Sequence, residues 1–182
     1  MKIAILGWGS LIWDPKKLDF NEQIGWNVNG PQLPIEFARI SGDGRLTLVI
    51  TEHGTFIPTL YAISKSNNFE KAIENLKSRE GTSSKYIGWY NRNSTIFYPE
   101  DFLFKENIKS WIIETDIDFV MWTNLPEKWI TKTKKEINPK ERITYLKELN
   151  SDVKEIAKEY IQKTPEQIQT KYRQLIKEEL KW

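Results

Sequence analysis

The hydrophobic period of this chain changes near residue 138, and this change limits its fold class more than any other feature. Before that point, short apolar runs end at Gly, Pro, Asn or Asp, a pattern typical of strands. After it, apolar residues recur every three or four positions, as they do on one face of a helix. The sequence therefore predicts an α+β protein, with a β-rich domain over residues 1–130 and a helical C-terminal extension over 131–182 packed on it.

The expected strands begin with Ile3–Leu6, a continuous apolar run that stops at Gly7. Two extended runs on either side of residues 41–44 read as a hairpin. Phe56–Ile63 is a further strand, in which Pro58 indicates an edge or a bulge. The runs expected to pair as hairpins are Ile35–Ile40 with Arg45–Thr51, Lys85–Tyr90 with Ser94–Tyr98, and Ser110–Glu114 with Ile117–Thr123.

One helix is expected in the first 130 residues, over 69–80. Its apolar positions fall on one face, Asn68 can cap its start and Gly81 can end it. In the helical extension, Thr164 followed by Pro165 is typical of a helix start.

The chain contains no Cys and a single His, His53. Thiolate nucleophiles, iron–sulfur clusters, Cys-ligated zinc and multi-histidine metal sites are therefore excluded. We expect no metal and no cofactor, and we expect proton transfer to fall to a carboxylate, a Lys, a Tyr or an amine.

The formal net charge of +2 is too small to indicate a nucleic-acid partner. No apolar run approaches the roughly 20 residues that span a bilayer, and the N-terminus lacks a small-residue cleavage site. We expect a cytoplasmic protein without a membrane partner.

The most informative motif follows the first expected strand and reads Gly7-Trp8-Gly9-Ser10-Leu11-Ile12-Trp13. It is neither a dinucleotide fingerprint, because the third Gly would fall at Ile12, nor a phosphate-binding loop, because no Gly-Lys-Ser/Thr follows. A Gly-x-Gly-Ser turn after a strand can gather backbone N–H groups into an anion-binding concavity. The alternative is a plain glycine turn between buried Trp residues.

This motif resembles the signature loop of the gamma-glutamylcyclotransferase superfamily, whose ChaC-like branch has Tyr-Gly-Ser-Leu-Ile-Trp after its first strand. The resemblance covers about residues 1–125; Trp8 replaces the Tyr, and the helices after Asn138 have no counterpart in it. It implies a small mixed β-barrel or strongly curved sheet with packed helices. The family's loop backbone holds the carboxylate end of a gamma-glutamyl group, which implies substrate binding by Gly7, Trp8, Gly9, Ser10, Leu11 and Ile12.

Two further positions acquire roles from the same resemblance. Phe37–Ser41 is similar to the family's basic second-strand region, which implies that Arg39 binds substrate. The catalytic Glu of the ChaC-like branch follows an Arg, as Glu80 follows Arg79 here. Glu80 is therefore the expected general base for cyclising a gamma-glutamyl amine or peptide to 5-oxoproline. That reaction supplies its own nucleophile, the substrate's α-amine, and needs neither Cys nor His.

Glu80 has a structural alternative, a last-turn helix carboxylate paired with Lys77 or Arg79. Neighbouring helix positions do not face each other, so Arg79 need not neutralise Glu80. Other polar residues rank lower. His53 is expected on a turn or the surface. Glu36 and Glu114 lie in strand-like runs and could face a cavity, but exposed strand positions are commoner. Arg39 and Arg45 could contact a substrate carboxylate, although cross-strand pairing with acids is the default.

Two functions of other classes stay open. The same loop could bind a small carboxylate or amide without turning it over. The helical extension could instead be an interaction surface, because its apolar stripes can pack either on the β-rich domain or on a second copy as a homodimer.

Overall fold

The computed structural model describes residues 1–182 and forms two compact units, each built from two segments of the chain. The first unit comprises Met1–Leu33 and Pro58–Leu125, and the second comprises Pro34–Ile57 and Pro126–Trp182. This division differs from the expected one, because residues 34–57 group with the C-terminal helices rather than with the remaining strands. No helix has both the length and the apolar character needed to cross a membrane.

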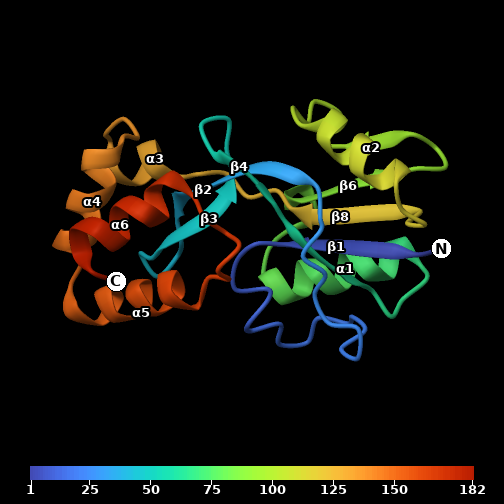
Figure 1. Ribbon diagram of the computed structural model, residues 1–182, viewed down its shortest axis with the longest axis horizontal. Helices are drawn as coiled ribbons and strands as arrows, with labels where there is room; N and C mark the ends of the chain where they lie inside the picture. The colour runs from blue at the N-terminus through green and yellow to red at the C-terminus, as the bar shows by residue number, and fades with distance from the viewer. The chain divides into compact units, whose positions relative to one another are not determined.

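The first unit contains a five-stranded mixed sheet with the strand order β5-β1-β8-β6-β7 (Figure 1). Its strands are β1 (Ile3–Gly7), β5 (Leu60–Ile63), β6 (Ile87–Asn91), β7 (Ile96–Tyr98) and β8 (Phe119–Thr123). β1 pairs parallel with β8, with Ile3 opposite Phe119, and antiparallel with β5. β1 has a neighbour on each edge and all five of its residues are buried, so both of its faces are covered, as its continuous apolar run indicates.

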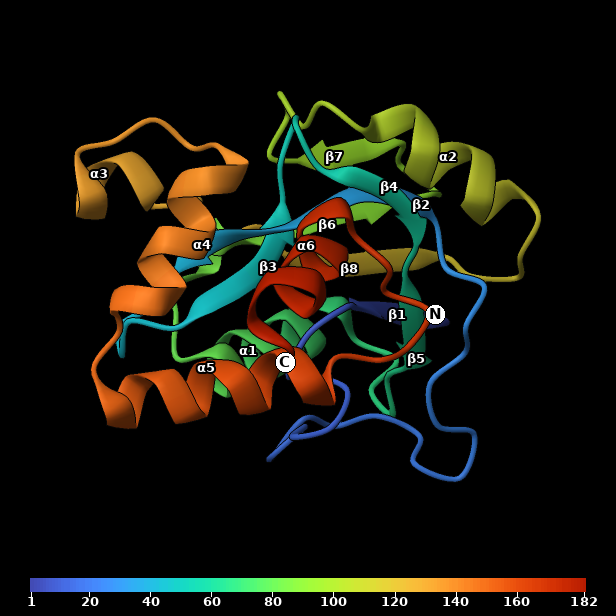
Figure 2. The same cartoon turned by 60° about the vertical axis from the view of Figure 1, so that its left-hand side comes forward.

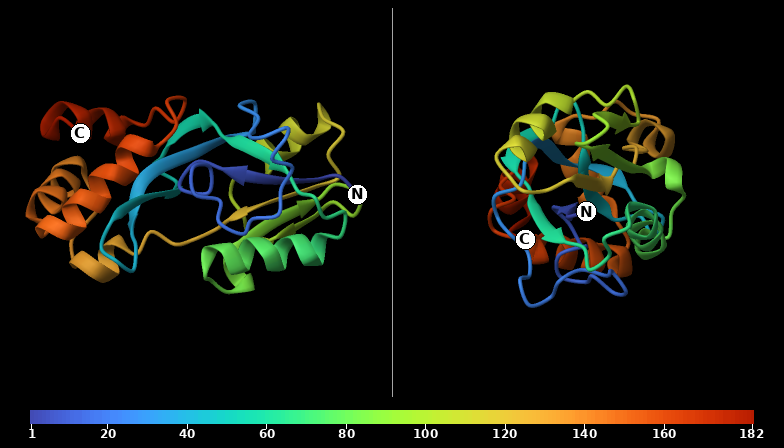
Figure 3. Two further views of the ribbon diagram at one scale, coloured as in Figure 1. Left: turned by 90° about the horizontal axis from the view of Figure 1, so that it is seen from below. Right: turned by 90° about the vertical axis from the view of Figure 1, so that its right-hand side faces the viewer.

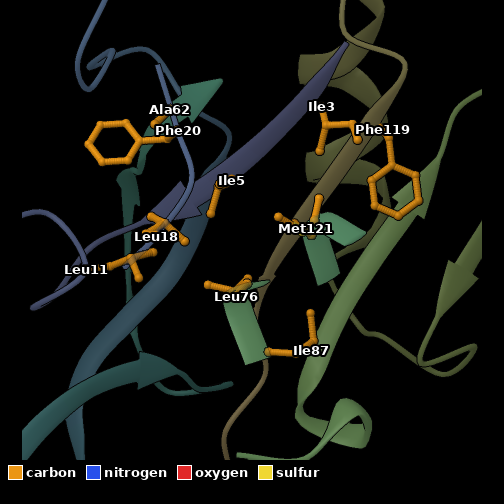
Figure 4. Packing of buried hydrophobic residues seen from close by; sticks show 11 residues of the cluster. Ile3, Ile5, Leu11, Leu18, Phe20, Ala62, Leu76, Ile87, Phe119 and Met121 are labelled. Carbon is orange, nitrogen blue, oxygen red and sulfur yellow. The ribbon is translucent and has the colours of Figure 1, made fainter. Parts of the chain in front are cut away.

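Helix α1 (Phe69–Glu80) packs along this sheet and contacts β6 and β8 (Figure 3). The expected caps are confirmed: Asn68 accepts a hydrogen bond from the Lys71 N–H, and Gly81 adopts a left-handed conformation with φ of 59°. The core of the unit joins the sheet, α1 and the segment after β1 (Figure 4). Its buried members are Ile3, Ile5, Leu11, Leu18, Phe20, Ala62, Ala72, Leu76, Ile87, Phe119 and Met121.

The predicted pairing of 85–90 with 94–98 is confirmed as the antiparallel pair β6–β7. The predicted hairpin of 110–114 with 117–123 is wrong. Residues 105–113 form helix α2 (Lys105–Ile113), and β8 pairs with β1 and β6 instead. The buried side chains of α2 are Ile108 and Ile112, a four-residue spacing that a window beginning at Ser110 cannot contain.

The second unit contains a three-stranded sheet of order β3-β2-β4, whose strands are β2 (Gln32–Ile40), β3 (Leu46–Ile50) and β4 (Thr55–Pro58). The predicted hairpin across residues 41–44 is confirmed, because β2 and β3 pair antiparallel with a register shift between Phe37 and Arg39. The expected single strand over 56–63 is wrong. It is divided at Thr59 into β4 and β5, which belong to different sheets.

Four helices complete the second unit (Figure 2). They are α3 (Trp129–Thr133), α4 (Pro139–Glu148), α5 (Ser151–Lys163) and α6 (Lys171–Leu180). α4 contacts both α5 and α6, and α5 lies on β3. The Tyr145 hydroxyl of α4 donates a 2.6 Å hydrogen bond to the carbonyl of Gly44 in the hairpin turn. The helices therefore cover the three-stranded sheet of their own unit.

The predicted helix start at Thr164-Pro165 is wrong. Thr164 is the C-cap of α5 and its hydroxyl donates to the Tyr160 carbonyl, whereas α6 begins at Lys171 with Thr170 as its N-cap. A threonine hydroxyl can serve either end of a helix, so the local sequence did not settle which one it serves. The α+β class is shown, but the strands form two sheets and no closed barrel.

Candidate functional site

The segment after β1 forms a tight turn fixed by its own backbone. The Ile12 N–H donates to the Gly9 carbonyl at 3.0 Å, and the Asp14 N–H donates to the Ser10 carbonyl at 2.9 Å. Ser10 and Leu11 are the two central residues of the turn between Gly9 and Ile12. Their N–H groups donate to neither of these backbone hydrogen bonds. This backbone conformation suits the anion-binding role that the sequence predicts.

The side chains of the turn are mostly directed into the protein. Leu11 is buried within the core of the first unit (Figure 4). Trp8 is also buried, while Ser10 and Ile12 are half-buried. Gly7 has a packing reason to be glycine, because a Cβ there would lie 2.6 Å from a ring carbon of Trp26. A ligand at this turn would therefore meet Trp8 and Leu11 through their backbone groups. The substrate-binding roles of Gly7–Ile12 stay predictions.

The apolar residues of helix α1 recur on one face, and the packing of that face places the last turn of the helix beside the segment after β1. Leu76 is buried in the core, and Arg79 and Glu80 follow it at three- and four-residue spacings, on the same face of the helix. Their side chains are accordingly shielded, with 5% of Arg79 and 15% of Glu80 exposed. The left-handed Gly81 ends the helix directly after Glu80.

A single guanidinium joins the two predicted parts of the site. Arg79 Nη1 lies 2.5 Å from Glu80 Oε1, and Arg79 Nη2 donates to Ser10 Oγ at 3.3 Å and to the Asp14 carbonyl at 2.5 Å. Ser10 and Glu80, 70 positions apart, thus bind neighbouring nitrogens of one side chain. The structure brings these two predicted residues together.

Glu80 forms an ion pair with Arg79, as its structural alternative had it, and the expectation that neighbouring helix positions do not face each other fails here. The expectation used the directions of side chains inside a regular helix. At the last residues of α1 the long Arg and Glu side chains converge beside the turn, where Arg79 also has backbone and hydroxyl acceptors. Glu80 is therefore neither solvent-exposed nor bound to Lys77, which pairs with Glu74 instead.

The remaining predicted residues lie elsewhere. Arg39 is on β2 in the second unit, where its Nη1 donates to the Pro126 carbonyl at 2.6 Å; its substrate-binding role stays a prediction. His53 is exposed in a turn, as expected. Arg45 pairs with Asp43 of its own turn rather than across strands, and Glu114 is exposed at the end of α2 rather than on a strand.

The expectation of an exposed Glu36 is wrong, since this side chain is 1% exposed. Its oxygens accept hydrogen bonds from the hydroxyls of Thr170 and Thr55 and from the N–H of Phe37. Burial raises the pKa of Glu36 above its ordinary value, although the hydrogen bonds from the Thr170 hydroxyl and the Phe37 N–H act in the opposite direction. The alternation of apolar and polar residues that marks a half-buried strand could not reveal the burial of Glu36, because β2 is buried on both faces over most of its length.

Asn75 is a residue of this region that the sequence did not single out. Its side chain accepts a 2.8 Å hydrogen bond from the Asp19 N–H and donates a 2.9 Å bond to the Lys17 carbonyl. The available signal was its position one turn before Arg79 on the same helix face.

No group of three or more His, Cys, Asp or Glu residues is arranged to hold a metal ion. No protein-family model, no curated protein and no solved structure matches this chain. The features of this chain that bear on its function are the Ser10–Arg79–Glu80 cluster and the Gly7–Trp13 loop.

Proposed function

We propose that this protein cyclises a gamma-glutamyl amine or peptide to 5-oxoproline and releases the amine, in the manner of the gamma-glutamylcyclotransferase superfamily. The observation that supports this proposal is the Arg79 guanidinium bound to both Ser10 and Glu80. A loop able to bind an anion and a shielded carboxylate are thereby held side by side within the first unit.

In the proposed reaction the substrate's α-ammonium group gives a proton to Glu80 and becomes a nucleophilic amine. The amine nitrogen attacks the γ-carbonyl carbon, and a new C–N bond closes the five-membered ring. The C–N bond to the leaving amine then breaks as that nitrogen takes the proton from Glu80. The ring nitrogen loses its second proton by the same route, so the ring keeps one N–H and the amine leaves as an ammonium ion. Atoms and charge balance without any other reactant.

The protein's task in this reaction is mainly positional. Orienting an amine and a carbonyl of one molecule for attack lowers the barrier by about 7–11 kcal/mol. The N–H groups of the turn would bind the α-carboxylate and keep the glutamyl chain folded. Glu80 would exchange the proton through Oε2, since Oε1 is bound to Arg79. A general base of this kind contributes about 10²–10⁴-fold to the rate.

The test is a screen of gamma-glutamyl amino acids, gamma-glutamylamines and glutathione for release of 5-oxoproline by the purified protein. Glu80→Gln should reduce the rate by about 10²-fold or more and leave the dissociation constant, measured by calorimetry, within a few-fold of the wild-type value. Glu74→Gln is the matched control, because Glu74 is an exposed carboxylate on the same helix. A Glu80→Gln variant with the wild-type rate would exclude Glu80 as the base.

The ion pair between Arg79 and Glu80 favours one alternative, a module that binds a small carboxylate or amide without turnover. In that function the pair would be a structural contact that shapes the pocket. Calorimetric binding of a gamma-glutamyl compound, with no 5-oxoproline released by the wild-type protein, would establish the alternative and exclude the enzyme.

Three further expectations belong to the same proposal: the partly closed or strongly curved sheet of the superfamily's fold, a cytoplasmic location, and a homodimer formed through the C-terminal helices. Sedimentation of the full chain, compared with a chain lacking residues 138–182, tests the dimer. Full activity of the shortened chain would exclude the reading in which the extension alone carries the function.

A further inference from the structure

One face of α1 is bound to the segment after β1 at two levels. Asn75 bonds the backbone of Lys17 and Asp19, and one turn later Arg79 bonds Ser10 and Asp14. Only the second level includes Glu80. The two residues therefore hold the same segment, but they differ in whether the carboxylate is part of the contact.

The Arg79 contacts depend on the shape of the guanidinium. Its two terminal nitrogens diverge from one planar carbon, so one points to Glu80 Oε1 while the other reaches Ser10 Oγ and the Asp14 carbonyl. Asp14 and Ser10 are also joined by one of the two backbone hydrogen bonds of the segment, from the Asp14 N–H to the Ser10 carbonyl. The position of Glu80 is thus fixed relative to the turn by one rigid group.

We propose that Arg79 is a positioning residue that sets the distance between the Glu80 carboxylate and the N–H groups of the Ser10 turn. This inference rests on the proposed cyclisation. The turn would bind the glutamyl carboxylate and Glu80 would take the proton from the α-ammonium group of the same molecule. Both groups are attached to one carbon atom of the substrate, so the two protein groups must keep a fixed separation.

A lysine cannot replace this function. Its single nitrogen carries the same charge but lacks the planar fork, so it cannot bind Glu80 and the turn in fixed directions at once. Arg79→Lys therefore separates the geometric role from the charge. Asn75→Ala is the matched control, because it removes two hydrogen bonds to the same segment without touching Glu80.

The experiment measures turnover and amide hydrogen exchange in wild type, Arg79→Lys, Arg79→Ala and Asn75→Ala, each checked for folding by circular dichroism. We expect Arg79→Lys to lower kcat at least tenfold with little change in KM. Added guanidinium should restore part of the kcat of Arg79→Ala. The kcat of Asn75→Ala should stay within about twofold of wild type.

Hydrogen exchange gives a readout independent of activity. The Ile12 and Asp14 amides, which are hydrogen-bonded in the turn, should exchange at least tenfold faster in both Arg79 variants and at the wild-type rate in Asn75→Ala. Wild-type kcat in a folded Arg79→Lys protein overturns the proposal, and so does unchanged exchange of these amides. If the wild-type protein releases no 5-oxoproline, the cyclisation fails, and the exchange rates alone decide whether Arg79 fixes the turn.

Discussion

Glu36 on β2 and Thr170 at the start of α6 are separated by 134 residues of sequence, and the Thr170 hydroxyl donates a 2.5 Å hydrogen bond to Glu36 Oε1. The carboxylate also accepts bonds from the Thr55 hydroxyl on β4 and, at 3.4 Å, from the Tyr172 N–H. One buried side chain therefore connects two strands and a helix of the second unit.

We expect Glu36 to make stability depend on pH. Burial raises its pKa above the ordinary 4.5 in the folded state, so the folded chain holds this proton to higher pH than the unfolded chain does. The free energy of unfolding therefore falls as pH rises from about 4.5 through the raised pKa. Glu36→Gln removes this titration. Urea denaturation from about pH 4 to about pH 8 should show wild type losing stability relative to the variant, and a pH-independent difference would contradict the prediction.

Removing the Thr170 hydroxyl should raise the pKa of Glu36 further, because that hydrogen bond lowers it. Thr170→Val also removes the N-cap of α6, so we expect a total cost of about 1–3 kcal/mol. The carboxyl resonance of Glu36 reports the pKa. Asn150→Ala, which removes the N-cap of α5, should cost about 1 kcal/mol and leave that resonance unchanged.

Prediction from the sequence succeeded where a single local signal determines the structure. The caps Asn68 and Gly81 bounded α1 correctly, and the period of the chain gave the α+β class. Prediction from the sequence failed where contacts with residues outside the segment determine its structure. The segment 110–114 is β-like by residue type but packs as a helix through Ile108 and Ile112, and Thr164 serves the preceding helix rather than the following one.

Gly7→Ala should destabilise the first unit by about 1–3 kcal/mol, because its new methyl group would overlap the Trp26 ring. Gly42→Ala is the control, since a Cβ at Gly42 meets nothing within 4 Å. Chemical denaturation followed by tryptophan fluorescence measures both. Equal stability of the two variants would show that the Trp26 ring yields without cost.

The two ends of α1 should differ in their effect on catalysis. Asn68→Ala and Gly81→Ala should each cost about 1 kcal/mol, the first through a lost cap and the second through a side chain forced into a left-handed conformation. Only Gly81 adjoins Glu80, so its substitution should lower kcat more than that of Asn68. Equal kcat values at equal stability would contradict this.

The separate parts of the candidate site could be predicted from the sequence, but the contacts of Arg79 that join them could not. The Gly7–Trp13 motif predicted the loop and Glu80 the carboxylate, whereas the ion pair of Glu80 with Arg79 was only a structural alternative to the catalytic role. The spacing of residues along a helix predicts which of them share a face. It does not state that a segment 65 positions earlier offers the Asp14 carbonyl to Arg79.

The central place of β1 has a consequence for biosynthesis. Its parallel neighbour begins at Phe119, opposite Ile3, and a parallel partner cannot be supplied by a tight turn. The opening strand must therefore leave the ribosome long before its partner is translated, and the apolar residues at the start of the chain stay unpaired on one side during that time. Chaperone binding to nascent chains that end before β8, and its loss once β8 has emerged, would be the cellular sign of this delay.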